Sequence, residues 1–205
     1  MIKLILGSLL IIVIASYVFH GFHKTYPIIE SKLPAQTVVY LEHIGSYHKI
    51  GDTFKIVGQD LKEASSLFSN PRMAAVYHDS PLELADHSTA RVTIGIFVPP
   101  SERASAVEFS KKFPNYELKD LPAITTVKSE ITYVSPLTNF WWMMTQYSKM
   151  IDLIRNNIKE SLENPMVIEY YELKEDTVGK IETHVPYGQG ISQWILAKAP
   201  QPLKK

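Results

Sequence analysis

Five residues of the sequence have side chains that together are able to hold a small organic molecule. They are one carboxylate, three aromatic rings and one imidazole: Glu169, Tyr171, Tyr40, Phe97 and His78. Each lies in a run of alternating residues typical of a β-strand, on the side opposite to the residues expected to pack under helices. Aromatic rings and a carboxylate on one sheet face bind flat or cationic molecules by stacking, cation–π attraction and opposite charge. The pattern therefore predicts a ligand site on the sheet face that the helices leave open.

The same alternation assigns the covered face of these strands. We expect the helices to cover the apolar set Val92, Ile94, Ile96 and Val98, the pair Ile181 and Val185, and the pair Ile168 and Tyr170. Glu169 has a simpler alternative, in which it is a solvated strand residue that pairs with Lys180. Single histidines on a sheet face, such as His78 and His184, are usually surface or hydrogen-bonded residues rather than ligands or bases.

No recognisable catalytic or cofactor motif accompanies these residues. A nucleophile elbow, a phosphate-binding loop, a His-Glu-x-x-His zinc motif and a dinucleotide fingerprint are all absent from the sequence. Gly188 and Gly190 follow a predicted strand but lack the third glycine and the helix, so they indicate a turn. His20 and His23 have no third ligand nearby, so they predict no metal site. We therefore expect a protein that is not an enzyme and needs neither a metal nor a cofactor.

Composition narrows the class of protein further. The 205 residues are 45% hydrophobic, which is enough for a full core. Lys and Arg total 21, as do Asp and Glu, so the net charge of zero offers no basic surface for nucleic acid. The absence of cysteine excludes disulfides and thiolate metal sites.

Two copies of the pattern strand, helix, strand, strand make up most of the chain, in halves at about 37–100 and 123–187. The first copy has strands over 38–44, 73–78 and 89–98 with a helix over 50–68, and the second has strands over 123–131, 166–173 and 178–186 with a helix over 136–162. An internal duplication allows all the strands to form one sheet. The sequence predicts an α+β fold with an antiparallel-rich sheet and both helices on one face.

The helix over 136–162 carries apolar residues at steps of three and four. This stripe is Leu137, Phe140, Trp141, Met144, Tyr147, Ile151, Ile154, Ile158 and Leu162. A stripe of this kind is typical of a helix that packs on a sheet, so we expect it to be buried. Trp141 then belongs to the core, while Trp142 lies at its flank or faces a partner.

The N-terminus is almost continuously apolar over 4–22, close to the ~20 residues that a helix needs to cross a bilayer. We expect a transmembrane anchor over 1–24; a cleaved signal peptide is the alternative, but bulky residues follow the small pair Ala15 and Ser16. Residues 25–36 then form a tether, 37–195 the domain and 196–205 a tail. The charges on the two sides of the anchor are nearly balanced, so they do not fix its orientation.

Four short motifs resemble those of the GyrI-like domain family, which is related to the ligand-binding regions of bacterial multidrug-sensing regulators. They are a strand entering Gly45-Ser46-Tyr47, the strand Ala75-Val76-Tyr77 followed by Asp79 and Pro81, Ile168-Glu169-Tyr170 after Asn164-Pro165, and a last strand ending Val185-Pro186. In such sensors a pocket glutamate meets cationic drugs, and Glu169 is the matching position. With the apolar N-terminus, the likeness extends to the testis-expressed type of GyrI-like ER-phagy receptor.

The resemblance implies a membrane-anchored adaptor on the endoplasmic reticulum, with its domain in the cytosol and a role in ER-phagy or protein quality control. The implied partners are autophagy modifiers and an AAA+ ATPase, together with the membrane itself. The receptor's C-terminal tail carries an aromatic-x-x-aliphatic motif that adds a strand to autophagy modifiers, and this sequence has no such tail after Lys205. Two alternatives stay open: a protein that binds a hydrophobic cation on the open sheet face, and a GyrI-like hydrolase that uses Glu169 as a base.

Overall fold

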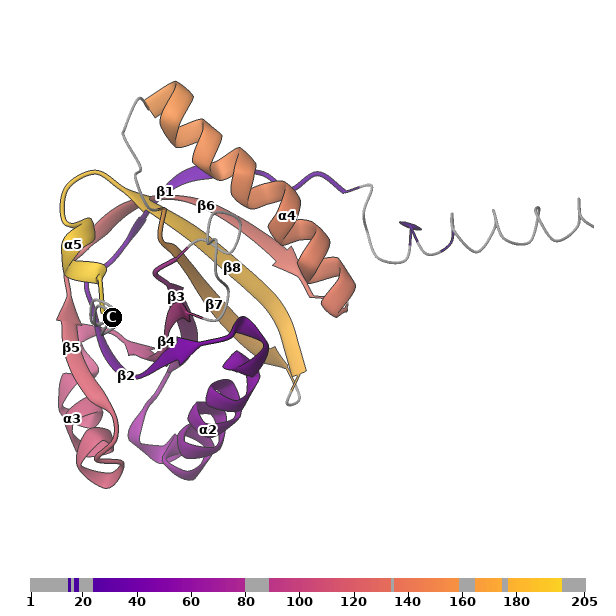
Figure 1. Cartoon of the computed structure of the whole chain (residues 1–205). Coiled ribbons are helices and arrows are strands. Elements are labelled where there is room, and N and C mark those ends of the chain that lie inside the picture. The colour runs from indigo at the N-terminus through magenta and orange to yellow at the C-terminus, as the bar shows by residue number, and fades with distance from the viewer. Residues whose placement is uncertain are drawn as a thin grey trace, which may run out of the picture.

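Eight antiparallel strands form a single curled sheet in the computed structural model, which describes residues 15, 17, 18, 24–79, 89–133, 135–158, 165–174 and 177–196 (Figure 1). The strands are β1 (Ile29–Leu33), β2 (Gln36–Gly45), β3 (Arg72–Tyr77), β4 (Ala90–Val98), β5 (Glu117–Leu121), β6 (Ile124–Thr132), β7 (Val167–Lys174) and β8 (Thr177–Tyr187). The helices are α2 (Ile50–Glu63), α3 (Arg103–Lys112), α4 (Pro136–Asp152) and the short α5 (Ile191–Trp194). The order across the sheet is β1-β6-β8-β7-β3-β4-β2-β5.

The order of the strands confirms the duplication. Strands β2, β4 and β3 follow one another in the first half, and β6, β8 and β7 follow one another in the second, so the halves meet where β3 pairs with β7. In each half the helix, α2 or α4, connects the first strand to the second. The predicted α+β fold and its single sheet are therefore confirmed.

Two edge strands were not predicted. β5 extends the first half beyond β2, and β1 extends the second half beyond β6, with Ile29 opposite Lys128 and Leu33 opposite Ile124. The expected tether over 25–36 is wrong in this respect, because residues 29–33 within it form strand β1 and Gln36 begins β2. Only residues 24–28 connect the region of the predicted anchor to the sheet.

The sheet is covered on both faces. α2 and α3 pack on one half of the outer face over Val39, Ile94 and Ile96, and α4 packs on the other half over Val127, Ile181 and Val185. The opposite face curls around α5 (Figure 1), and its apolar cluster contains Trp194 and Leu196. The face that the sequence left open is therefore largely core.

α4 buries a different stripe from the one predicted. Trp142 is 1% exposed and Trp141 is 45% exposed, the reverse of the expectation. The buried residues include a row at steps of four positions: Thr138, Trp142, Gln146, Met150 and Ile154. Such a row is inclined to the helix axis, so α4 packs on the sheet along this row rather than along the straight stripe read from the sequence. The prediction is correct for Tyr147, Ile151 and Ile154, which are buried. Ile158 is half-buried, and Leu162 lies outside the described residues.

The end of this helix also differs from the predicted range. After Asp152 the chain continues as one π-helical segment, Leu153–Ile158, and the remainder of the predicted helix lies outside the described residues. The predicted anchor over 1–24 falls there too, apart from Ala15, Tyr17, Val18 and Lys24. Within the part of the chain that the structure describes, no helix is long and apolar enough to cross a bilayer.

Gly95 permits the close approach of β4 to β2. A Cβ atom at this position would lie 2.5 Å from the carbonyl oxygen of Val39 and 2.8 Å from Cβ of Tyr40. We expect Gly95→Ala to lower the free energy of unfolding by about 1–3 kcal/mol, because the strands must separate to admit the methyl group. Urea unfolding measures this change.

Gly58, in the middle of α2, is the matched control. A Cβ atom there meets nothing within 4 Å. Gly58→Ala is therefore expected to raise the free energy of unfolding by about 1 kcal/mol through helix propensity. Equal effects of the two substitutions would contradict the proposed role of Gly95.

Candidate functional site

Glu169 lies in the middle of β7, under the helices, and is only 3% exposed. Tyr147 of α4 donates its hydroxyl hydrogen to Oε1 of this carboxylate, and Thr183 of β8 approaches the same oxygen at 3.5 Å. Tyr171 donates to Oε2 at 2.5 Å. Two strands and a helix of the second half therefore converge on one acid.

The first half of the chain completes the surroundings. The hydroxyl groups of Tyr77, on β3, and Tyr171 are 3.0 Å apart. Phe54 of α2 meets the Tyr171 ring edge to face at 5.0 Å, and Tyr47 lies 6.3 Å from Tyr77 between ring centroids. We call Glu169, Tyr77, Tyr147, Tyr171 and Thr183 the glutamate cluster; it lies where the two halves of the sheet meet.

The electrostatics of the cluster are those of an acid without a counter-cation. No Lys or Arg of the described chain forms an ion pair with Glu169, and all its hydrogen-bond donors there are hydroxyl groups. Burial raises the pKa of Glu169, although the hydroxyl donors oppose this shift. Burial and the nearby carboxylate raise the pKa of Tyr77, Tyr147 and Tyr171 well above 10, so they remain neutral donors.

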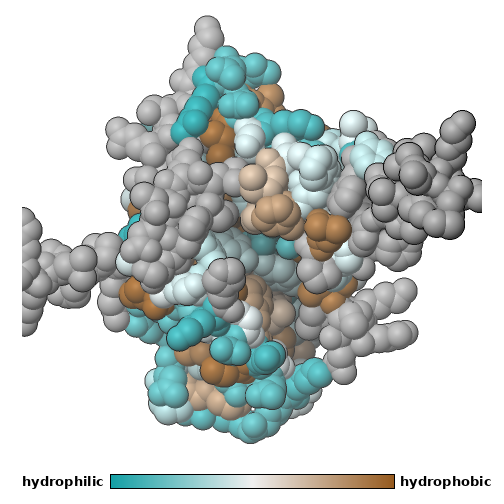
Figure 2. Space-filling model, turned by 45° about the vertical axis from the view of Figure 1, so that its right-hand side comes forward, coloured by the Kyte–Doolittle hydropathy of each residue, from teal (hydrophilic) through white to brown (hydrophobic). Residues whose placement is uncertain are grey.

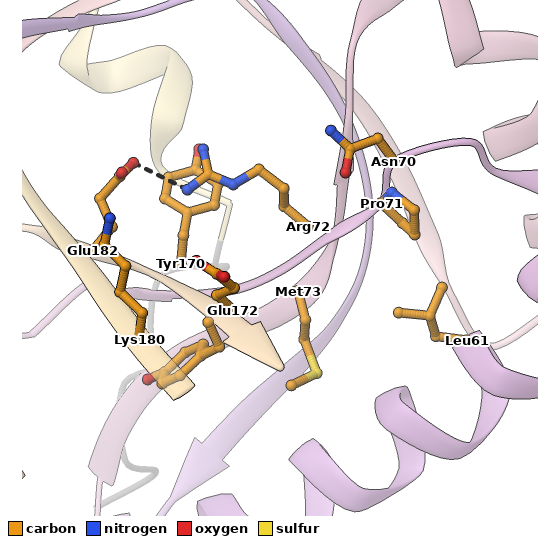
Figure 3. Close-up of a pocket in the computed structure, with 10 residues that line it drawn as sticks. Leu61, Asn70, Pro71, Arg72, Met73, Tyr170, Glu172, Lys180 and Glu182 are labelled. Carbon is orange, nitrogen blue, oxygen red and sulfur yellow. Dashed lines mark hydrogen bonds and ion pairs between the residues drawn. The ribbon is translucent and has the colours of Figure 1, made fainter. Parts of the chain in front are cut away.

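A pocket of about 630 Å³ adjoins the cluster, a volume within the usual range of small-molecule sites. Its lining comes from α2, the start of β3 and the two residues before it, and the middle parts of β7 and β8: Leu61, Asn70, Pro71, Arg72, Met73, Tyr170, Tyr171, Glu172, Lys180 and Glu182. Figure 3 shows the Arg72 guanidinium over the Tyr170 ring, with Leu61 and Met73 on the other side of the space. Because Tyr171 both lines the pocket and donates to Glu169, the two regions share a wall.

The structure does not bring all five predicted residues together. Glu169 and Tyr171 lie on the helix-covered face, so the face predicted for them is wrong. Tyr40 and Phe97 lie on the opposite face, as predicted, where the Tyr40 hydroxyl donates to Glu117 at 2.9 Å and Phe97 meets Tyr170 at 5.5 Å.

His78 is the fifth of the predicted residues. Its Nε2 lies 2.9 Å from the Thr93 hydroxyl, and burial and Arg91 lower its pKa to about 4. This histidine is hydrogen-bonded rather than placed near Glu169. Whether any of the five binds a ligand stays a prediction.

The sequence of β7 alone does not show which of its residues face the helices. Ile168 and Tyr170 alternate with Glu169 and Tyr171, and both pairs are largely buried, so either pair fits under a helix. The register decides, because Ala75 of the helix-covered cluster lies opposite Glu169. The alternative, in which Glu169 is a solvated residue that pairs with Lys180, is also wrong, since Glu169 is buried and Lys180 pairs with Glu130 at 2.9 Å.

Three members of the cluster, and all the residues that line the pocket except Tyr171, were not predicted as site residues. Tyr147 and Tyr77 were noted only as a core and a motif residue, Thr183 was not noted, and Arg72 was not considered. A signal was available for the tyrosines, because a buried tyrosine hydroxyl needs a hydrogen-bond partner. It could not specify that the partner is Glu169.

A second polar network lies on the opposite face. Glu182 accepts from Arg72 at 3.0 Å, from Lys128 at 3.1 Å and from Nε2 of His184 at 2.9 Å, while the Thr126 hydroxyl lies 2.9 Å from Nδ1 of His184. His184 is therefore hydrogen-bonded, as expected, and burial lowers its pKa. Every charge in this network has a partner, in contrast to Glu169.

The sheet with its duplicated β-α-β-β units is the GyrI-like α+β fold. The sequence matches no protein-family model and no curated protein. Among solved structures, the EcmrR C-terminal domain matches with a TM-score of 0.55 and 17% identity, over 80% of this chain and 99% of that one.

Two further structures have the same fold. SAV2435 bound to tetraphenylphosphonium matches with a TM-score of 0.51 and 13% identity, over 81% of this chain and 95% of that one. An uncharacterized conserved protein from Listeria innocua matches with a TM-score of 0.52 and 12% identity, over 78% of this chain and 92% of that one. At these identities the likeness establishes the fold alone.

Proposed function

We propose that this protein binds a hydrophobic organic cation at the glutamate cluster. The observation that carries the proposal is that Glu169 is buried among neutral tyrosine hydroxyls with no cation of the described chain beside it. A buried carboxylate without opposite charge is unfavourable, and a cationic ligand would supply that charge. The tetraphenylphosphonium bound to SAV2435, which has the same fold, is a ligand of this class.

The adjoining pocket offers the route to the acid. Tyr77 and Tyr171 are partly exposed, while Tyr147 is buried behind them. A ligand in the pocket would contact the Tyr171 ring, which separates the pocket from Glu169. Rotation of the Tyr171 side chain would then allow the positively charged group of the ligand to approach the carboxylate. Aromatic faces favour such a cation over a neutral molecule of equal size.

Calorimetric titration with tetraphenylphosphonium tests the proposal, with triphenylphosphine oxide as the neutral control. We expect the cation to bind and the neutral compound to bind much more weakly. Protonation of Glu169 removes the opposite charge, so affinity for the cation should fall as the pH is lowered through the pKa of this residue. Because that pKa is raised, the loss should begin at a higher pH than for an ordinary glutamate. Equal affinity for both compounds at every pH would contradict the proposal.

The proposal describes binding without catalysis. Hydrolysis of a model ester that Glu169→Gln abolishes would instead support the hydrolase alternative. The adaptor role on the endoplasmic reticulum, the cytosolic side of the domain and the autophagy-related partners stay predictions that rest on the resemblance. Protease protection of membranes that carry the full chain tests the side on which the domain lies.

A further inference from the structure

Four large apolar side chains are exposed along the first half of α4. Leu137, Phe140, Trp141 and Met144 are 50%, 55%, 45% and 44% exposed and lie at helical spacing on one stripe. Farther along the helix this stripe becomes polar, with exposed Ser148 and Asp152. The apolar surface is therefore confined to about two turns, and we call these four residues the α4 stripe.

The chain enters the domain beside this helix. Tyr26 and Ile28 pack against the apolar cluster beneath α4, which includes Trp142 and Tyr147. Strand β1 then pairs with β6, the strand that precedes α4. In Figure 1 the start of α4 and the described start of the tether both lie toward the right-hand side of the molecule. Figure 2 brings this side forward and shows brown, hydrophobic side chains at its surface.

The link to the predicted anchor is short. The apolar segment ends at Phe22, and Tyr26 follows four residues later. A fully extended chain of four residues spans about 14 Å, so an anchor that ends at Phe22 would hold the cluster beneath α4, against which Tyr26 packs, near the bilayer surface. The strand β1 removes the longer tether that would have lifted the domain away from the membrane.

We propose that the α4 stripe contacts the bilayer, with its aromatic and aliphatic side chains in the headgroup region next to the anchor. Tryptophan and phenylalanine are suited to this depth, and an apolar helix face binds there in proportion to the apolar area that it buries. The polar residues from Ser148 onward leave the second half of the helix in water. This inference rests on the predicted anchor and is independent of the proposed cation site.

Single-cysteine spin labelling of the full chain in phospholipid vesicles tests the contact, since the native sequence has no cysteine. A label at Phe140→Cys is expected to collide several-fold more often with dissolved oxygen than with a water-soluble nickel chelate. The matched control is Ile56→Cys on α2, an exposed apolar residue (48%) on the other half of the domain. There the chelate should collide at least as often as oxygen.

Each other outcome overturns the proposal for a different reason. A label at 140 that behaves like the label at 56, in protein that floats with the vesicles, means that the stripe stays in water. Spin–spin broadening at 140 means that a second copy of the chain covers the stripe. Failure of the full chain to float with vesicles removes the anchor and, with it, the membrane contact.

Discussion

Glu169→Gln is expected to abolish the binding of tetraphenylphosphonium and to leave the protein folded. The substitution keeps the shape of the side chain and one acceptor oxygen, so it can accept from either Tyr147 or Tyr171, while its NH2 group donates to the other hydroxyl once that hydroxyl has turned to accept. It removes the charge. Losing one partner of a buried charge pair costs about 2–5 kcal/mol of binding free energy, a decrease in affinity of at least about 30-fold. Calorimetric titration measures this loss.

Although Glu169→Gln should lose affinity for the cation, its folded state should be as stable as that of the native protein or more stable. The pKa of Glu169 is raised by burial, so the protonated carboxyl is the form that the fold favours, and its stabilising effect is lost as the pH rises through that pKa. Near neutral pH, Glu169→Gln should therefore unfold at an equal or higher temperature than the native protein. Glu117→Gln, which alters the partner of Tyr40 on the other face, is the control for binding and should leave affinity unchanged. Unchanged affinity in Glu169→Gln would rule out the cluster as the cation site.

Glu182→Gln is expected to have the largest effect on stability. Hydrogen bonds from His184, Arg72 and Lys128 hold the pKa of Glu182 well below its usual range, and its side chain is only 17% exposed. Hydrogen bonds to a charged group contribute about 1.5–3 kcal/mol. The glutamine leaves Arg72 without its opposite charge and leaves Lys128 with only the longer ion pair to Glu130 at 3.7 Å. We expect the free energy of unfolding at pH 7 to fall by about 2–3 kcal/mol, measured by urea unfolding.

The pH dependence of this effect has a definite sign. A depressed pKa in the folded state adds stability above the unfolded pKa of about 4, and this contribution disappears as the pH falls toward the folded value. The difference between the native protein and Glu182→Gln should therefore shrink below about pH 4. Glu130→Gln is the control, because this more exposed residue pairs with Lys180 at 2.9 Å and with Lys128 only at 3.7 Å. Its substitution should cost at most about 1 kcal/mol. Equal losses in the two variants would mean that the network around Glu182 is no more than a surface ion pair.

The sequence was sufficient for the three strands and the helix of each repeat, because each half has clear alternation and clear breaks, but it did not predict the edge strands β1 and β5. The apolar sets of β4 and β8 were assigned to the correct face, since their outward positions carry Arg91, Lys180 and Glu182. β7 has no such contrast, because the sheet is covered on both sides and aromatic residues occupy both faces of the strand. The register with its neighbours β3 and β8 resolves this, and a register cannot be read from the sequence of one strand.

The orientation of α4 could not be predicted for a related reason. The first turns of the helix contain two adjacent stripes: an apolar one through Trp141, and one through Trp142 that also carries the polar residues Thr138 and Gln146. The inclined packing of α4 and the bond from Tyr147 to Glu169 select the second stripe. These are contacts between segments far apart in sequence, which helical periodicity does not contain. The cluster was therefore only partly predictable: its acid was found, and most of its donors were not.

The pairing of β3 with β7, where the two repeats meet, has a consequence for the charge of a ligand bound there. Ala75 and Glu169 face each other across the β3–β7 ladder, close to the pseudo-twofold relation of the repeats, so a methyl group occupies one side and an acid the other. A symmetric pair of acids would favour a dication centred on the axis. With one acid and one methyl group, the proposed site would favour a ligand with a single positive charge that binds away from the axis, nearer to Glu169 of the second repeat.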